Sequence, residues 1–147
     1  MAYIENNLIG EEKIIAKGNI PMVIFFNSAI IFLIGLFLSM QHIAWLILVL
    51  ISGFFLIDTA IWAATREIAI TSKRIIYKWG LIQTHTTEVN LENIVSVNVK
   101  QGVIGKLFNY GSLKVKGTGN TSLSTSDIKN PLAFRKNILS YIEEMKA

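Results

Sequence analysis

The sequence predicts a membrane-spanning α-helical hairpin joined to a mainly-β domain that ends in one helix. Three observations support this fold class: two long apolar stretches in residues 21–64, apolar and polar residues that alternate from position 66 onward, and an apolar stripe at helical spacing near the C-terminus. These patterns are typical of membrane helices, of half-buried strands and of an amphipathic helix, respectively. We therefore expect an N-terminal segment (1–20), a hairpin (21–64) and a domain (65–147).

The hairpin is predicted from length and charge. Residues 21–40 contain no charged side chain, and residues 43–64 contain only Asp58. Each stretch has about the 20 residues that cross roughly 30 Å of hydrocarbon. Only Gln41 and His42 separate them, so both chain ends should emerge on the same side. A buried hairpin inside a soluble protein is the alternative, and the length and the near absence of charge disfavour it.

The basic residues predict which side that is. Lys13 and Lys17 precede the first stretch, Arg66, Lys73 and Arg74 follow the second, and the connecting turn has no basic residue. Because cytoplasmic flanks carry the excess of positive charge, both termini should be cytoplasmic. Residues 65–147 contain twelve Lys and Arg against six Asp and Glu, which favours attraction to an anionic leaflet.

A few polar residues interrupt the apolar stretches: Asn27, Ser28, Ser52, Asp58 and Thr59. An ionisable group in a membrane helix is costly and indicates function or a protein contact. Asp58 lies about two turns from the cytoplasmic end, where water or Arg66 can reach it. Two interpretations stay open: a structural Asp58 bonded within a hairpin or oligomer or turned toward the interface, and an Asp58 that takes part in ion movement.

The alternation predicts strands at 66–71, 74–79, 83–90, 94–101, 112–116 and 121–126. In the fifth of these, Leu113 and Val115 should face inward while Lys114 and Lys116 face solvent. A helical turn is expected at 103–108. Residues 13–17 also read as a strand, and because a lone strand is unstable we expect it to pair with the sheet that follows the hairpin.

The chain should end in a helix that covers the sheet. Asn130 is a suitable N-cap and Pro131 a suitable first residue. One apolar face follows, with the spacing of an amphipathic helix: Phe134, Ile138, Tyr141, Ile142 and Met145. This stripe would close the core of a domain of about eighty residues.

Several motifs, in order, resemble the bacterial pleckstrin-homology-like (bacterial PH) domain of small membrane proteins. They are residues 70–80 (ITSKRIIYKWG), 88–97 (EVNLENIVSV), Gly105, Tyr110-Gly111, 117–119 (GTG) and 130–135 (NPLAFR). The resemblance implies seven antiparallel strands in two nearly orthogonal sheets, a sandwich or barrel capped by one C-terminal helix. It also implies the inner membrane of a bacterium, and residues 13–17 would supply the seventh strand.

The chemistry of the sequence disfavours catalysis. His42 lies in the external turn and His85 in a cytoplasmic strand, so they cannot act together, and no catalytic or metal-binding motif is found. We expect no enzyme activity, no cofactor and no metal, and the absence of cysteine excludes thiolate chemistry. Nucleic acid is also disfavoured, because no aromatic surface with interleaved Arg is evident.

We therefore expect a non-enzymatic, membrane-anchored binding or assembly module that acts in a homo-oligomer or with other membrane proteins. A first alternative is a module that senses anionic lipid. By analogy with eukaryotic pleckstrin-homology domains, it would use basic residues of the first hairpin of strands: Lys73, Arg74 and Lys78. The same residues would serve equally to fix topology. A second alternative is an accessory subunit of a transporter that uses Asp58.

Overall fold

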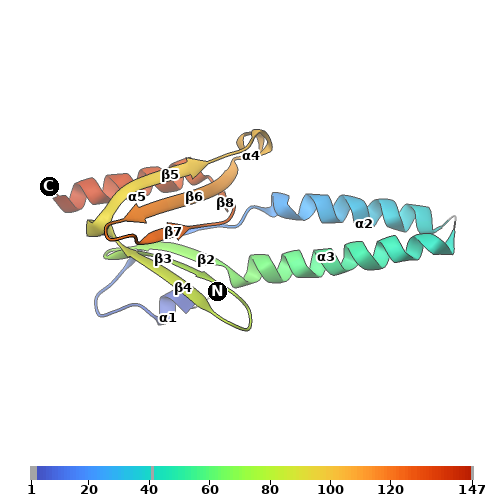
Figure 1. Cartoon of the computed structure of the whole chain (residues 1–147), viewed down its shortest axis with the longest axis horizontal. Coiled ribbons are helices and arrows are strands. Elements are labelled where there is room, and N and C mark those ends of the chain that lie inside the picture. Colours follow the sequence, from blue (N-terminus) through green and yellow to red (C-terminus); the bar gives the residue numbers. More distant parts are fainter. Residues whose placement is uncertain (1–2, 41, 147) are drawn as a thin grey trace. The chain divides into compact units, whose positions relative to one another are not determined.

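The computed structural model describes residues 3–40 and 42–146. It divides into two compact units (Figure 1). The hairpin unit is Met22–Thr65, and the β domain combines the residues up to Pro21 with those from Arg66 onward. The β domain is therefore assembled from segments on both sides of the hairpin in the sequence.

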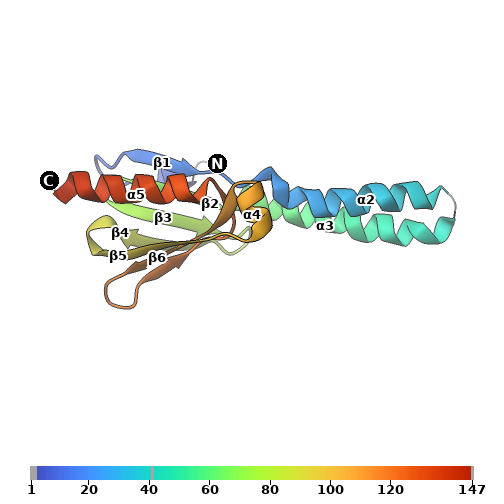
Figure 2. The same ribbon diagram turned by 90° about the horizontal axis from the view of Figure 1, so that it is seen from above.

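The hairpin unit contains η1 (Met22–Phe25), α2 (Phe26–Ser39), η2 (Ile43–Trp45) and α3 (Leu46–Thr65). The two long helices lie side by side (Figure 2). They approach closely at Gly35, where an added Cβ would lie 3.3 Å from Val49 Cγ2. Gly35 and Ser52 are buried, whereas most of the large apolar side chains of these helices point outward.

The first sheet of the β domain has the order β1-β2-β3-β4, and all of its pairings are antiparallel. Its strands are β1 (Ile14–Gly18), β2 (Glu67–Thr71), β3 (Arg74–Trp79) and β4 (His85–Asn90). β1 occupies one edge, where Ala16 pairs with Ile70 and Lys17 with Ala69. A strand from before the hairpin thus completes a sheet built from residues that follow it.

The second sheet is formed by β5 (Ile94–Lys100), β6 (Tyr110–Gly117) and β7 (Ser122–Ser124), and the two-residue strand β8 (Ile128–Lys129) pairs with the start of β6. η3 (Leu91–Asn93) joins the two sheets, and α4 (Val103–Leu107) connects β5 to β6. Within β6, Leu113 and Val115 are fully buried while Lys114 and Lys116 are exposed, which confirms the predicted alternation.

The helix α5 (Pro131–Lys146) covers the core and packs on β1, β5 and β6. Phe134, Ile138 and Ile142 belong to the main apolar cluster, but Met145 is 42% exposed, so the buried stripe ends before it. The carbonyl of Asn130 accepts the first helical bond from the Phe134 N–H at 3.0 Å. Asn130 itself has φ +52°, unlike the extended backbone of a usual N-cap.

A short helix that sequence patterning did not predict, α1 (Tyr3–Asn6), lies on the outer face of the first sheet. Ile4 is 3% exposed and packs with Ala69 and Ile76 in a second apolar cluster. Residues 68–71 of β2 are therefore all buried. They lack the alternation of buried and exposed residues expected for a sheet with one solvent-exposed face. The antiparallel sheets and the C-terminal helix nevertheless agree with the predicted fold.

Candidate functional site

The basic residues singled out in the sequence lie on the first hairpin of strands. Arg74 and Lys78 are at alternate positions of β3 with Ile76 between them, so all three face the same side of the sheet. Ile76 packs against Ile4 of α1. The N-terminal segment thus lies over the face of the sheet to which the side chains of Arg74 and Lys78 belong.

Arg74 makes a two-pronged ion pair with Glu12. Its Nε and Nη2 each lie 3.1 Å from one of the two carboxylate oxygens. The Glu12 side chain is fully buried and that of Arg74 is 12% exposed. Arg74 also donates to Glu88 at 2.5 Å and to the Asn7 carbonyl at 3.3 Å. Its guanidinium is thus held by groups of the protein, and it fastens the N-terminal segment to the β2–β3 hairpin.

The Glu12 carboxylate is held in its charged form. Burial raises the pKa of Glu12, but this effect is outweighed by hydrogen bonds from Thr71 Oγ1 at 2.5 Å and the Ile9 N–H at 3.0 Å, together with Arg74. The pKa therefore lies below its ordinary value of 4.5. A buried carboxylate with this many donors is typical of a fixed structural network.

The two lysines have different surroundings. The Lys78 ammonium lies 5.4 Å from the centroid of the Tyr3 ring, a cation–π geometry. Lys73 is exposed on the turn between β2 and β3, and its backbone carbonyl accepts from the Leu91 N–H at 3.0 Å. Each of the three basic residues thus has its own environment. Binding of a lipid head group by Lys73, Arg74 and Lys78 remains a prediction.

A polar group that sequence reasoning missed joins Arg66 to Tyr77 and Ser126. The Arg66 guanidinium donates to the Ser126 hydroxyl and, at 3.4 Å, to the Tyr77 hydroxyl. These side chains line a cavity of about 10 Å³ together with Gly18, Ile20, Glu67, Ile68, Asp127 and Ile128. That volume holds about one water molecule and is far below the roughly 300 Å³ of a small-molecule site. Sixty positions separate Arg66 from Ser126, so no local motif could have revealed the group.

The two polar residues of the apolar stretches that were predicted as candidates, Asn27 and Asp58, are both exposed on the helical hairpin. Gly35 faces Val49 and Gly53 faces Phe32, so the residue numbers of two facing residues add up to 84 or 85. The numbers 27 and 58 also add up to 85, so Asn27 and Asp58 lie at the same level along the two helices. The carboxyl group of Asp58 has no hydrogen-bond or ion-pair partner in the described part of the chain.

The two histidines lie in different units of the described structure. His85 stacks on Trp79, with ring centroids 5.5 Å apart, and Trp79 stacks on Tyr77 at 5.2 Å. His42 lies in the other unit, just before η2. Among residues 3–40 and 42–146, no group of three or more His, Cys, Asp or Glu side chains is arranged to hold a metal ion.

Comparison with known proteins identifies the family. The bacterial PH domain family matches residues 28–142, most of the chain. No curated protein and no solved structure matches the sequence. PH-like domains are generally binding modules without catalytic activity. The family match and the antiparallel sheets capped by α5 lead to one conclusion: this chain belongs to the bacterial PH domain family.

Proposed function

We propose that this protein is a non-enzymatic, membrane-anchored binding module that works by assembling with other membrane proteins or with further copies of itself. In this proposal α2 and α3 cross the inner membrane of a bacterium, and the β domain and both termini lie in the cytoplasm. The family supports a binding role, and the properties of the hairpin support the membrane anchor and the assembly.

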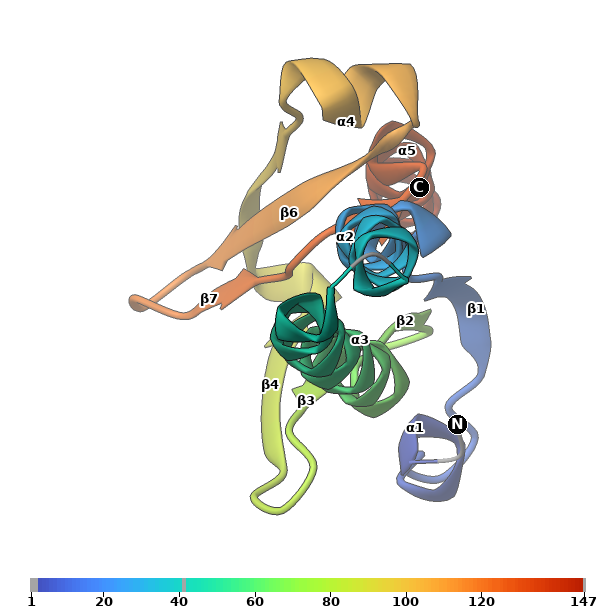
Figure 3. The same cartoon turned by 90° about the vertical axis from the view of Figure 1, so that its right-hand side faces the viewer.

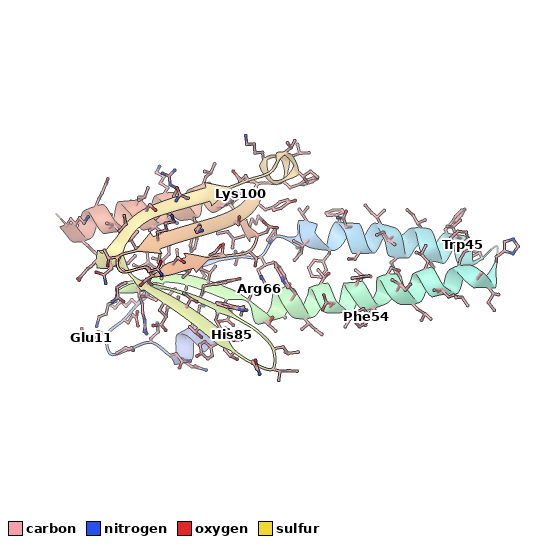
Figure 4. All side chains as sticks on the ribbon, in the orientation of Figure 1. Glu11, Trp45, Phe54, Arg66, His85 and Lys100 are labelled. Carbon is pink, nitrogen blue, oxygen red and sulfur yellow. The ribbon has the colours of Figure 1, made fainter. Side chains whose placement is uncertain are left out.

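The surface of the hairpin supports membrane insertion. Two helical stretches, Met22–Ser39 and Ile43–Thr65, are long and apolar enough to span, and only 6% of each is buried. Large side chains such as Phe37, Leu50 and Phe54 are 66–73% exposed, and Figure 4 labels Phe54. A core helix of a soluble protein would be covered by its own chain. Lipid is the solvent that suits a helix exposed and apolar on every side.

Asp58 is the observation that carries the assembly role. Its carboxyl group lies on the outer surface of the hairpin, without a partner in the described chain, at the level of the equally exposed Asn27. Polar groups at membrane depth face protein or water, because lipid offers them no hydrogen bond. A neighbouring helix of a second copy or of another membrane protein would satisfy both residues.

The mass of the full-length protein extracted in mild detergent, with copurifying proteins identified by mass spectrometry, tests this proposal. We expect a discrete homo-oligomer or a stoichiometric complex that Asp58→Leu dissociates. Asp58→Asn should preserve it, because the amide still forms hydrogen bonds. Thr59→Val is the matched control, since the Thr59 hydroxyl is already bonded to the Phe55 carbonyl at 2.8 Å in its own helix.

Two results would refute the assembly role. One is a monomeric wild-type protein without partners, and the other is an Asp58→Leu variant whose mass and partners match those of the wild type. Asp58→Asn also separates the transporter alternative, because a carboxyl group that takes part in ion movement cannot be replaced by an amide. That alternative predicts an intact complex whose transport is lost.

A further inference from the structure

One end of the β domain carries exposed aliphatic side chains on the short helix α4 and on the loop 80–84 between β3 and β4. We call the following five residues the apolar rim: Leu81, Ile82, Val103, Ile104 and Leu107. They are 61–94% exposed, and Ile82 is the most exposed of them. Figure 3 shows α4 and the β3–β4 loop at opposite edges of this end of the domain. Each of the two groups of exposed aliphatic side chains is a candidate interaction surface.

The strand register places α4 and the loop 80–84 at one end of the β domain. At this end the chain enters the hairpin and returns from it. In the first sheet, Glu67 at the start of β2 pairs with Lys78 near the end of β3. The loop 80–84 therefore lies beside the start of β2, where the chain returns from the hairpin. In the second sheet, β8 pairs with the start of β6, directly after α4. The Lys129 N–H of β8 donates to the carbonyl of Asn19, just beyond β1, at 2.7 Å.

The connections between the two units are very short. Residues 19–21 alone join β1 to η1, and Arg66 alone joins α3 to β2. Because an extended chain covers at most about 3.6 Å per residue, Gly18 lies within about 15 Å of Met22. If the hairpin spans the membrane, this end of the domain is tethered at the bilayer surface and the apolar rim is within reach of lipid.

Charge and asymmetry both favour a lipid surface as the occupant. Lys100 and Lys106, on either side of the start of α4, are exposed and suit anionic head groups. The turns at the other end of the strands, 72–73 and 118–120, contain no large apolar residue. Ile9 and Val95 are exposed toward that end, but the five residues of the apolar rim outnumber them.

We propose that the apolar rim inserts into the boundary between the head groups and the acyl chains of the bilayer that the hairpin crosses, and so fixes the β domain on the membrane surface. The inference rests on the proposed function, because it needs the hairpin to be in the membrane. It assigns a lipid-contacting role to residues outside the Lys73, Arg74 and Lys78 group.

Single-cysteine variants of the full-length protein test this inference, because the natural chain contains no cysteine. Ile82→Cys and Val103→Cys would be labelled with an environment-sensitive fluorophore. The labelled protein would be reconstituted at one copy per nanodisc of phosphatidylethanolamine and phosphatidylglycerol. Thr118→Cys, at the opposite end, is the matched exposed control, and Leu50→Cys reports on the hairpin itself. Quenching by lipid-borne nitroxide is compared with quenching by aqueous iodide.

We expect the labels at positions 82 and 103 to be quenched several-fold more by lipid nitroxide, and several-fold less by iodide, than the label at 118. Equal iodide quenching of the labels at 82, 103 and 118, together with lipid-nitroxide quenching of the label at position 50, would overturn the insertion of the apolar rim and leave the membrane anchor intact. Iodide quenching at position 50 would instead refute the anchor and the inference with it. Protection of 82 and 103 from both quenchers would indicate a protein contact and also overturn the inference.

Discussion

At the scale of single residues, Glu12 and Arg74 connect the segment before the hairpin to the sheet built after it. Sixty-two positions separate them in the sequence, yet their side chains form two charge-assisted hydrogen bonds of 3.1 Å. The carboxylate is fully buried and the guanidinium nearly so. A buried pair of this kind is most sensitive to the loss of one partner, because the remaining charge is left without compensation.

Replacing Arg74 should therefore destabilise the β domain strongly. Arg74→Ala leaves the buried Glu12 carboxylate unpaired, and we expect the free energy of unfolding to fall by about 3–5 kcal/mol. Denaturant unfolding of the full-length protein in detergent, followed by the β-sheet circular dichroism signal, measures this. Lys73→Ala, at the exposed neighbouring position, should change it by less than about 0.5 kcal/mol. Equal effects of the two substitutions would contradict a structural role for Arg74.

The Glu12 carboxylate should also make stability depend on pH. Its pKa is lowered in the folded protein, so its contribution is fully present above the unfolded-state pKa, near 4.5, and is lost as pH falls through the folded-state value. We expect the melting temperature of the wild type to exceed that of Glu12→Gln at pH 7, and the gap to narrow below about pH 4.5. Melting curves at several pH values check this, and a gap that is constant or widens in acid would contradict it.

At the scale of elements, the glycines of the β5–α4–β6 connection mark close backbone contacts. An added Cβ would lie 2.6 Å from the Tyr110 carbonyl oxygen at Gly105, and 2.5 Å from the Lys100 carbonyl oxygen at Gly111. A side chain fits at neither position unless the backbone moves. Gly105 and Gly111 are therefore needed for α4 to fold tightly between β5 and β6.

Gly111→Ala should destabilise the domain, whereas Gly102→Ala should not. The first substitution forces a methyl group against the Lys100 carbonyl, and overpacking of this kind costs about 1–3 kcal/mol. Gly102 has open space around its Cβ position and φ −76°, so we expect a change within about 0.5 kcal/mol there. Thermal unfolding of the two variants side by side measures the difference. Similar melting temperatures would show that the contact at Gly111 can relax.

The elements that local patterns control could be predicted from the sequence. Alternation located β1 to β7 to within two residues but missed the two-residue strand β8. The stripe from Phe134 to Ile142 located α5, and the ordered motifs between residues 70 and 135 indicated the family. The patterns could not reveal α1, because a four-residue helix has no periodicity to detect. They also could not reveal the partner of Arg74, because only the fold brings Glu12 to it. For that reason Arg74 stood out as a free cation in the sequence although it is paired in the structure.

At the scale of the whole molecule, the hairpin is inserted in the sequence between two paired strands of the first sheet, β1 and β2. The strands on either side of it are hydrogen-bonded neighbours, with Gly18 paired to Ile68, so the hairpin leaves and re-enters the domain through adjacent strands. Only residues 19–21 and Arg66 connect the hairpin to these two strands.

The central claim is that the chain crosses the membrane twice with the β domain on the cytoplasmic side, and single-cysteine labelling in cells tests it most directly. His42→Cys lies between the two helices and Lys116→Cys on an exposed position of β6. A membrane-impermeant maleimide should label His42→Cys in intact cells, and Lys116→Cys only after the inner membrane is permeabilised. Labelling of Lys116→Cys in intact cells, or of His42→Cys only after permeabilisation, would contradict this topology.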